Sequence, residues 1–73
     1  MDIIVYKTKV KILVSNKSLN KEVQCLNCFG LVIDYSEKDD YYTVEFEYIT
    51  NNGEIDTEIV FLKRNEFVVL EDS

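Results

Sequence analysis

Residues 41–62 read YYTVEFEYITNNGEIDTEIVFL, and this stretch carries the strongest structural signal in the chain. On both sides of Asn52-Gly53, aromatic and β-branched residues alternate with polar ones at a period of two, as in strands with one buried face. Asn-Gly is favoured in two-residue hairpin loops because both residues accept a positive φ. The stretch therefore predicts a β-hairpin with strands at 41–49 and 54–62.

A loop made of Asn52 and Gly53 alone fixes the register of this hairpin, because Asn51 then pairs with Glu54. Further along, the predicted partners are Tyr48 with Thr57, Glu47 with Glu58, Phe46 with Ile59 and Val44 with Phe61. Alternation directs Tyr42, Val44, Phe46 and Tyr48 inward. Four carboxylates then share the outer face, and we call this predicted surface the acidic ribbon: Glu45, Glu47, Asp56 and Glu58. Like charges placed opposite each other cost about 0.2–1 kcal/mol.

The same alternation predicts three further strands, at 4–14, 31–35 and 67–70. Between the first two, residues 15–29 lose the alternation and collect serine and asparagine, which indicates a long loop with a helical turn near 19–23. Residues 63–66 form a polar bend of one turn before the last strand. Valine, isoleucine, tyrosine, phenylalanine and threonine are abundant and alanine is absent, so we expect an all-β fold.

Length and composition limit the functions to consider. The chain has 73 residues, 47% of them hydrophobic and 30% charged, which is typical of one small globular domain. It has no histidine and only two glycines, so the commonest acid–base group and a glycine-rich phosphate loop are both missing. We expect one non-catalytic domain spanning 1–73, with a frayed tail at 71–73.

The beginning of the chain favours the cytoplasm. Asp2 stands where a signal peptide carries positive charge, and the apolar run that follows is too short for the hydrophobic region of such a peptide. No run of apolar residues approaches the length of a membrane span. We therefore expect a cytoplasmic protein that does not enter the membrane.

Two cysteines, Cys25 and Cys28, are spaced like metal ligands. A structural zinc site needs four ligands, and the chain has no histidine to complete one. We expect ordinary reduced thiols, at least one of them buried, and no cofactor. A zinc site shared between two subunits is the alternative.

The two signs of charge are separated along the chain. Residues 1–23 hold five lysines and two acids, a balance of +3, whereas residues 24–73 hold three bases and twelve acids, a balance of −9. Three lysines occupy one face of the first strand and two more follow in the long loop: Lys7, Lys9, Lys11, Lys17 and Lys21. In the acidic part, Asp39 and Asp40 lie at a turn beside Tyr41, which alternation places outside. Such a separation is typical of a protein that presents a charged face to a partner.

Four short motifs have a familiar order and spacing: Val10-Lys11-Ile12, Gly30-Leu31-Val32, Tyr42-Thr43-Val44-Glu45-Phe46 and Asn65-Glu66-Phe67. Together they resemble the KOW-type and photosystem-I-subunit-E-type members of the SH3-like small barrels. The resemblance implies a five-stranded barrel with a long loop after strand one and a single helical turn before strand five. It also implies a module that binds RNA, ribosomes, proline-rich peptides or a larger complex. The chain departs from the peptide-binding type in having no tryptophan and from the nucleic-acid type in being acidic.

The sequence therefore favours a non-catalytic module with a protein partner that has a basic surface. The predicted partner-binding residues are Asp39, Asp40, Tyr41, Glu45, Glu47, Asp56 and Glu58. Carboxylates spaced two apart along adjacent strands resemble the charges of a nucleic-acid backbone, which suits a phage or mobile-element inhibitor that docks on a basic host protein in an anti-defence role.

Two other functions stay open. A KOW-like module would bind RNA or ribosomes, and its candidate nucleic-acid-binding residues are Lys7, Lys9, Lys11, Lys17 and Lys21. A minor structural subunit of a larger complex is the other. A separate alternative for the acidic ribbon is that it is merely a solvated surface.

Overall fold

The computed structural model describes residues 7–15 and 25–70. In this part of the chain, five strands and one 3-10 turn follow one another: β1 (Lys9–Ile12), β2 (Phe29–Ser36), β3 (Tyr41–Ile49), β4 (Ile55–Leu62), the turn Arg64–Glu66 and β5 (Phe67–Val69). All strands belong to one antiparallel sheet with the order β4-β3-β2-β1-β5. The expected all-β class and the single turn before the last strand are confirmed.

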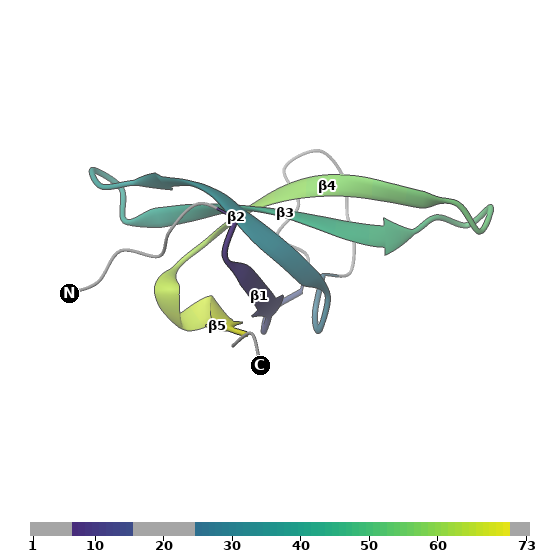
Figure 1. Cartoon of the computed structure of the whole chain (residues 1–73), viewed down its shortest axis with the longest axis horizontal. Helices are drawn as coiled ribbons and strands as arrows, with labels where there is room; N and C mark the ends of the chain where they lie inside the picture. Colours follow the sequence, from purple (N-terminus) through teal and green to yellow (C-terminus); the bar gives the residue numbers. More distant parts are fainter. Residues whose placement is uncertain (1–6, 16–24, 71–73) are drawn as a thin grey trace.

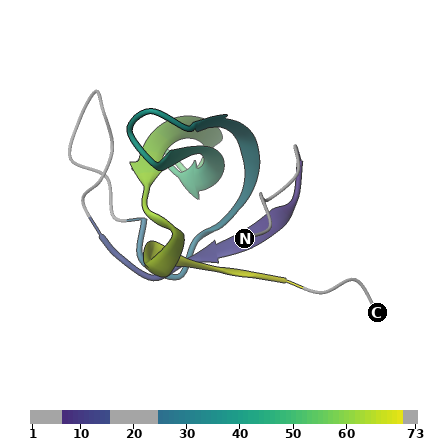
Figure 2. The ribbon, with the colours of Figure 1, turned by 90° about the vertical axis from the view of Figure 1, so that its left-hand side faces the viewer.

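The sheet is long, twisted and curled. Strands β2, β3 and β4 run along the long axis, with β1 and β5 below them in the view of Figure 1. Seen along that axis, the chain winds round on itself (Figure 2). The edge strands β4 and β5 do not pair with each other, so the hydrogen-bonded sheet of the described residues is open.

One face of the sheet carries the hydrophobic core. The fully buried side chains come from all five strands and from the turn before β2: Val10, Ile12, Cys25, Val32, Tyr42, Val44, Phe46, Val60, Leu62 and Phe67. The Tyr42 ring meets Phe67 edge-on at a centroid distance of 5.3 Å, the arrangement that aromatic quadrupoles favour. The inward positions predicted for β3 are confirmed, with Tyr48 packed at the margin of the core.

Gly30 lets β2 pass close to β3. A β-carbon built at this position would lie 2.7 Å from Cγ1 of Val44 and 2.7 Å from the carbonyl oxygen of Glu45. The strand therefore needs a residue without a side chain here, and Gly30 lies within β2 instead of opening it. Further along, the register between β2 and β3 shifts between Val32 and Asp34, as at a β-bulge.

The hairpin loop has three residues between the bonded pair Thr50 and Glu54, not the two predicted between Asn51 and Glu54. The N–H of Thr50 donates to the carbonyl of Glu54 at 2.8 Å, and the N–H of Gly53 donates to the carbonyl of Thr50 at 2.9 Å. Gly53 has a φ of 82°, so the loop is a tight turn followed by one left-handed residue. Thr50 Oγ1 also accepts hydrogen bonds from the N–H groups of Asn52 and Glu54, which favours the longer loop.

The extra loop residue moves β4 by one position relative to the prediction. Phe46 pairs with Glu58, Val44 with Val60 and Glu47 with Thr57. Because side chains alternate between faces, this shift exchanges the two faces of β4. Val60 and Leu62 are buried, whereas Phe61, predicted to face Val44 in the core, is 41% exposed. The predicted pairs of Glu47 with Glu58 and of Phe46 with Ile59 are therefore wrong.

Other predicted boundaries differ less. Strand β3 has the predicted bounds, and β4 and β5 are each one residue shorter than predicted. Strand β2 begins at Phe29, two residues earlier than predicted. For the predicted first strand at 4–14, the structure describes β1 at Lys9–Ile12. Residues 1–6, the helical turn predicted near 19–23 and the tail at 71–73 lie outside the described residues.

Candidate binding surfaces

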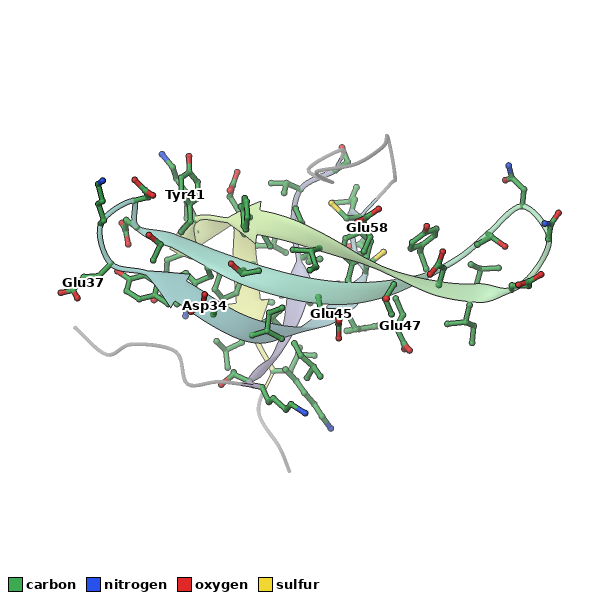
Figure 3. All side chains as sticks on the ribbon, turned by 90° about the horizontal axis from the view of Figure 1, so that it is seen from above. Asp34, Glu37, Tyr41, Glu45, Glu47 and Glu58 are labelled. Carbon is green, nitrogen blue, oxygen red and sulfur yellow. The ribbon has the colours of Figure 1, made fainter. Side chains whose placement is uncertain are left out.

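The acidic ribbon does not exist as a single surface. Glu45 and Glu47 are exposed on the outer face, away from the core. Glu58 lies opposite Phe46 and is only 8% exposed, and Figure 3 shows it on the other side of the β3–β4 ribbon from Glu45 and Glu47. Asp56 pairs with the inward-facing Tyr48. The shifted register therefore divides the four carboxylates between two faces.

Asp56 and Glu58 bind backbone donors of their own strand. Asp56 Oδ1 accepts a hydrogen bond from the N–H of Thr57 at 2.8 Å, and Glu58 Oε1 accepts one from the N–H of Ile59 at 3.2 Å. Thr50 and Glu54 form a hydrogen-bonded pair, and in an antiparallel hairpin every second pair of residues is hydrogen-bonded. The backbone groups of the even-numbered residues of β4 therefore bond to β3. The N–H groups of Thr57 and Ile59 therefore point to the outer edge of the sheet, where the two carboxylates cap them.

A second group of acids lies at the turn between β2 and β3. Residues 37–40 are all exposed, and their conformation is set by local hydrogen bonds. The N–H of Asp40 donates to the carbonyl of Ser36 at 2.7 Å, and the N–H of Asp39 donates to Ser36 Oγ at 3.3 Å. The Tyr35 hydroxyl donates to Asp40 Oδ1 at 3.0 Å, which raises the pKa of Tyr35. The turn is thus held in one shape with its carboxylates in solvent.

Tyr41 follows this turn directly and is 38% exposed, so the predicted exposed aromatic is confirmed. The Nζ of Lys63 lies 5.9 Å from its ring centroid, within reach of a cation–π contact. Figure 3 shows Tyr41 and Glu37 at the same end of the molecule. We call the surface formed by Glu37, Asp39, Asp40 and Tyr41 the acidic turn.

The lysines of the first strand lie on the outer face of the sheet. Lys9 pairs with Leu31 and Lys11 pairs with Phe29 across β1 and β2. Lys7 is also exposed and has a φ of 65°. Lys17 and Lys21 lie outside the described residues. Lys9 and Lys11, the part of the predicted stripe that lies on β1, therefore border an apolar stripe on β2.

Phe29 is the surface residue that sequence reasoning missed. The loss of alternation over residues 15–29 predicts a loop at this position, yet Phe29 is the first residue of β2 and is 62% exposed. The alternation of Phe29 and Leu31 around Gly30 is the signal in the sequence for a strand here, and it is weak because glycine is more common in loops than in strands. Together with Lys9, Glu45 and Glu47, these two side chains line a hollow of about 400 Å³.

The two cysteines are thiols in a tight turn. Cys25 is buried and its Sγ donates to the carbonyl of Val14 at 3.2 Å, which confirms the prediction that at least one would be buried. The N–H of Cys28 donates to the carbonyl of Cys25 at 3.0 Å, and Asn27 between them has a φ of 67°. Burial, followed by the nearby Cys25, raises the pKa of Cys28, so little reactive thiolate forms at neutral pH.

Within residues 7–15 and 25–70, no three cysteine, aspartate or glutamate side chains gather closely enough to hold a metal ion. The same residues include no helix that is long and apolar enough to cross a membrane. No protein family, curated protein or solved structure matches the chain.

Proposed function

We propose that the protein is a non-catalytic protein-binding module that docks through the acidic turn on a partner with a basic surface. The observation that carries this proposal is the ordered, exposed group of Glu37, Asp39 and Asp40 beside the half-exposed Tyr41. Glu45 and Glu47 are a weaker candidate, because Lys9 and Lys11 lie on the same face two strands away.

The physical properties of the acidic turn suit a binding site. Its hydrogen bonds order the loop before a partner arrives, so less conformational entropy is lost on binding. Exposed carboxylates speed the approach of a basic surface and fix its orientation. Tyrosine combines a large apolar ring with a polar hydroxyl and is enriched among residues that dominate interface energy. Tyr41 is therefore the expected anchor and the carboxylates the expected rim.

We also propose that the curled sheet is a small barrel of the SH3-like class. The pairing of β5 with β1 and the single turn between β4 and β5 support this assignment. Such barrels serve mainly as binding modules, in line with the resemblance of the four sequence motifs. The fold class and the acidic turn therefore support the same kind of function.

The partner we favour is a nucleic-acid-binding protein of the host, blocked by an inhibitor that a phage or mobile element encodes. The net charge of −6 supports this version, since a groove that holds nucleic acid attracts an acidic domain. The inhibitor would occupy the place of the nucleic acid.

The test is to capture a partner with the tagged full chain from a lysate of host cells. Asp39→Lys combined with Tyr41→Ala is expected to reduce recovery of the partner at least tenfold. Glu54→Lys is the matched control, because Glu54 is also exposed but lies at the opposite end of the β3–β4 hairpin. Unchanged recovery with the first variant contradicts the proposal, and a stoichiometric multi-subunit assembly in place of one partner identifies a minor structural subunit.

A second candidate function is RNA binding, and one observation favours it. Phe29 is 62% exposed and lies directly opposite Lys11, a combination in which a base stacks on the ring while the lysine meets a phosphate. Binding to a single-stranded RNA that weakens with salt and is lost in Phe29→Ala supports this candidate. Absence of binding at low salt removes it.

A further inference from the structure

The outer face of the sheet carries three parallel stripes of different chemistry. Strand β1 contributes Lys9 and Lys11, β2 contributes Leu31 and Phe29, and β3 contributes Glu45 and Glu47. Lys9, Leu31 and Glu45 form one row across the three strands. Lys11, Phe29 and Glu47 form the next row, because Gly30, the neighbour of Phe29, pairs with Phe46. The order across the sheet is therefore basic, apolar, acidic.

Within residues 7–15 and 25–70, the charges of this face are not matched by other side chains. Neighbouring strands are about 4.8 Å apart, so the lysine and glutamate stripes are separated by about 10 Å. No hydrogen bond or ion pair engages the side chains of Lys9, Lys11, Glu45 or Glu47 in the described part of the chain. Between them lie the exposed ring of Phe29 and the hollow of about 400 Å³.

We propose that this face binds a second copy of the same chain, in a symmetric dimer whose two-fold axis runs parallel to β2. Rotation about that axis places β1 of the partner over β3, and β2 of the partner over β2. Lys9 then faces Glu45 of the partner subunit, Lys11 faces Glu47 of the partner subunit, and each pair occurs twice. The Phe29 and Leu31 stripes meet at the centre of the interface.

Charge complementarity selects this occupant and this orientation. A two-fold axis perpendicular to the strands would place lysine over lysine and glutamate over glutamate, and like charges brought together disfavour that complex. A nucleic acid laid across the face meets the glutamates, and a basic peptide meets the lysines. A second copy satisfies both stripes at once, as the self-complementary surface of a two-fold interface requires.

The composition of the face also suits an interface. An apolar centre with charged residues around it is the usual anatomy of a protein–protein contact. Val68 is exposed on β5 opposite Lys11, on the far side of the lysine stripe from this apolar centre. The four charged side chains sum to zero on each copy, so the contact itself brings no net charge together despite the total of −6. Facing sheets pack about 10 Å apart with strands within about 30° of each other, which tolerates the twist seen in Figure 1.

The test is the mass of the full chain measured by analytical ultracentrifugation between about 1 and 500 µM. We expect a concentration-dependent dimer. The double reversal K9E/K11E is expected to raise its dissociation constant by about 100-fold, because like charges then face each other. Adding E45K/E47K to the same chain exchanges the two stripes and is expected to restore the dimer to within about tenfold of the original.

The matched control is the exchange of Glu37 and Lys38, by E37K/K38E, which rearranges charge in the acidic turn and leaves the outer face intact. This variant is expected to dimerise normally, and circular dichroism shows that each variant is folded. A monomeric wild-type chain over the whole range, a K9E/K11E variant that still dimerises, or a folded quadruple variant that stays monomeric would each overturn the proposal. Partner capture through Asp39 and Tyr41 is measured in a separate experiment. A failure to capture a partner therefore leaves the result on dimerisation unaffected.

Discussion

Strands β3 and β4 are neighbours of similar length in one hairpin, but only the sequence of β3 clearly specifies which face of the strand is buried. In β3 the even positions are aromatic or aliphatic and the flanking odd positions include Glu45 and Glu47, so one face is clearly apolar. In β4 the odd positions Ile55, Ile59 and Phe61 are as apolar as the buried Val60 and Leu62. Only β3 has a pattern that determines which face is buried.

The difference shows that the loop, and not the pattern, decides the orientation of β4. A strand that is apolar on both faces loses little burial when it shifts by one residue, so the turn geometry selects the register. Thr50, with its bonds to Asn52 and Glu54, supplies that selection.

The first prediction compares one phenylalanine from each strand. Phe46 is buried on β3 and Phe61 is 41% exposed on β4. Phe46→Ala should reduce the free energy of unfolding by about 3–5 kcal/mol, whereas Phe61→Ala should change it by about 0.5 kcal/mol or less. Urea denaturation measures both, and Phe46→Leu gives a milder variant if Phe46→Ala does not fold. A large loss for Phe61→Ala would favour the register with Phe61 in the core.

The second prediction compares one glutamate from each strand. Glu58→Lys should cost about 1–3 kcal/mol of stability, because it removes the acceptor for the N–H of Ile59 and forces a cation into a position that is 8% exposed. Glu47→Lys, on the solvated outer face, should change stability by about 0.5 kcal/mol or less. Thermal unfolding at low protein concentration provides the measurement, and equal effects would contradict the division of the carboxylates between two faces.

The third prediction concerns Gly53. A β-carbon there meets no atom within 4 Å, but the residue has a φ of 82°, which L-residues disfavour. Gly53→Ala should therefore destabilise the protein by about 1–2 kcal/mol through backbone strain alone. Gly53→Asn should cost less, since asparagine tolerates this conformation. If alanine and asparagine are equally tolerated, the loop does not need a left-handed residue.

The fourth prediction is a deletion with a small effect. Removing Asn52 leaves Asn51-Gly53 as a two-residue loop that closes the same pair, Thr50 and Glu54, so the register of β4 is retained. Stability should change by about 1 kcal/mol or less, because Asn-Gly suits a two-residue loop. Backbone NMR contacts between Val44 and Val60 report the register directly. If the natural loop had two residues, the deletion would shift β4 and unfold the protein.

Much of the fold was predictable from the chain because its signals are local. Alternation gave the bounds of β3 and the inward set of Tyr42, Val44 and Phe46, and the polar stretch at 63–66 indicated the turn before β5. The loop length was not predictable from Asn52-Gly53 alone, because the hydroxyl of Thr50 competes with that signal by binding two backbone donors. A single residue of difference was enough to exchange the two faces of β4.

The candidate binding residues also differ in whether their exposure could be predicted from the sequence. Asp39, Asp40 and Tyr41 were recognisable because a charged turn next to an alternating strand is exposed whatever the register. Glu58 was misplaced because its face depends on the register across the hairpin. Phe29 was missed because Gly30 looks like the end of a loop, whereas its role is to let β2 approach β3 within the sheet.

The carboxylates that cap the outer N–H groups of β4 have a consequence for the behaviour of the protein at high concentration. An open edge strand with apolar side chains is a template for fibril growth, and β4 exposes Ile55 and Phe61. Asp56 and Glu58 occupy two of the donors that an incoming strand would need. Asp56 and Glu58 thus hinder the pairing of a strand from another molecule with the edge of β4.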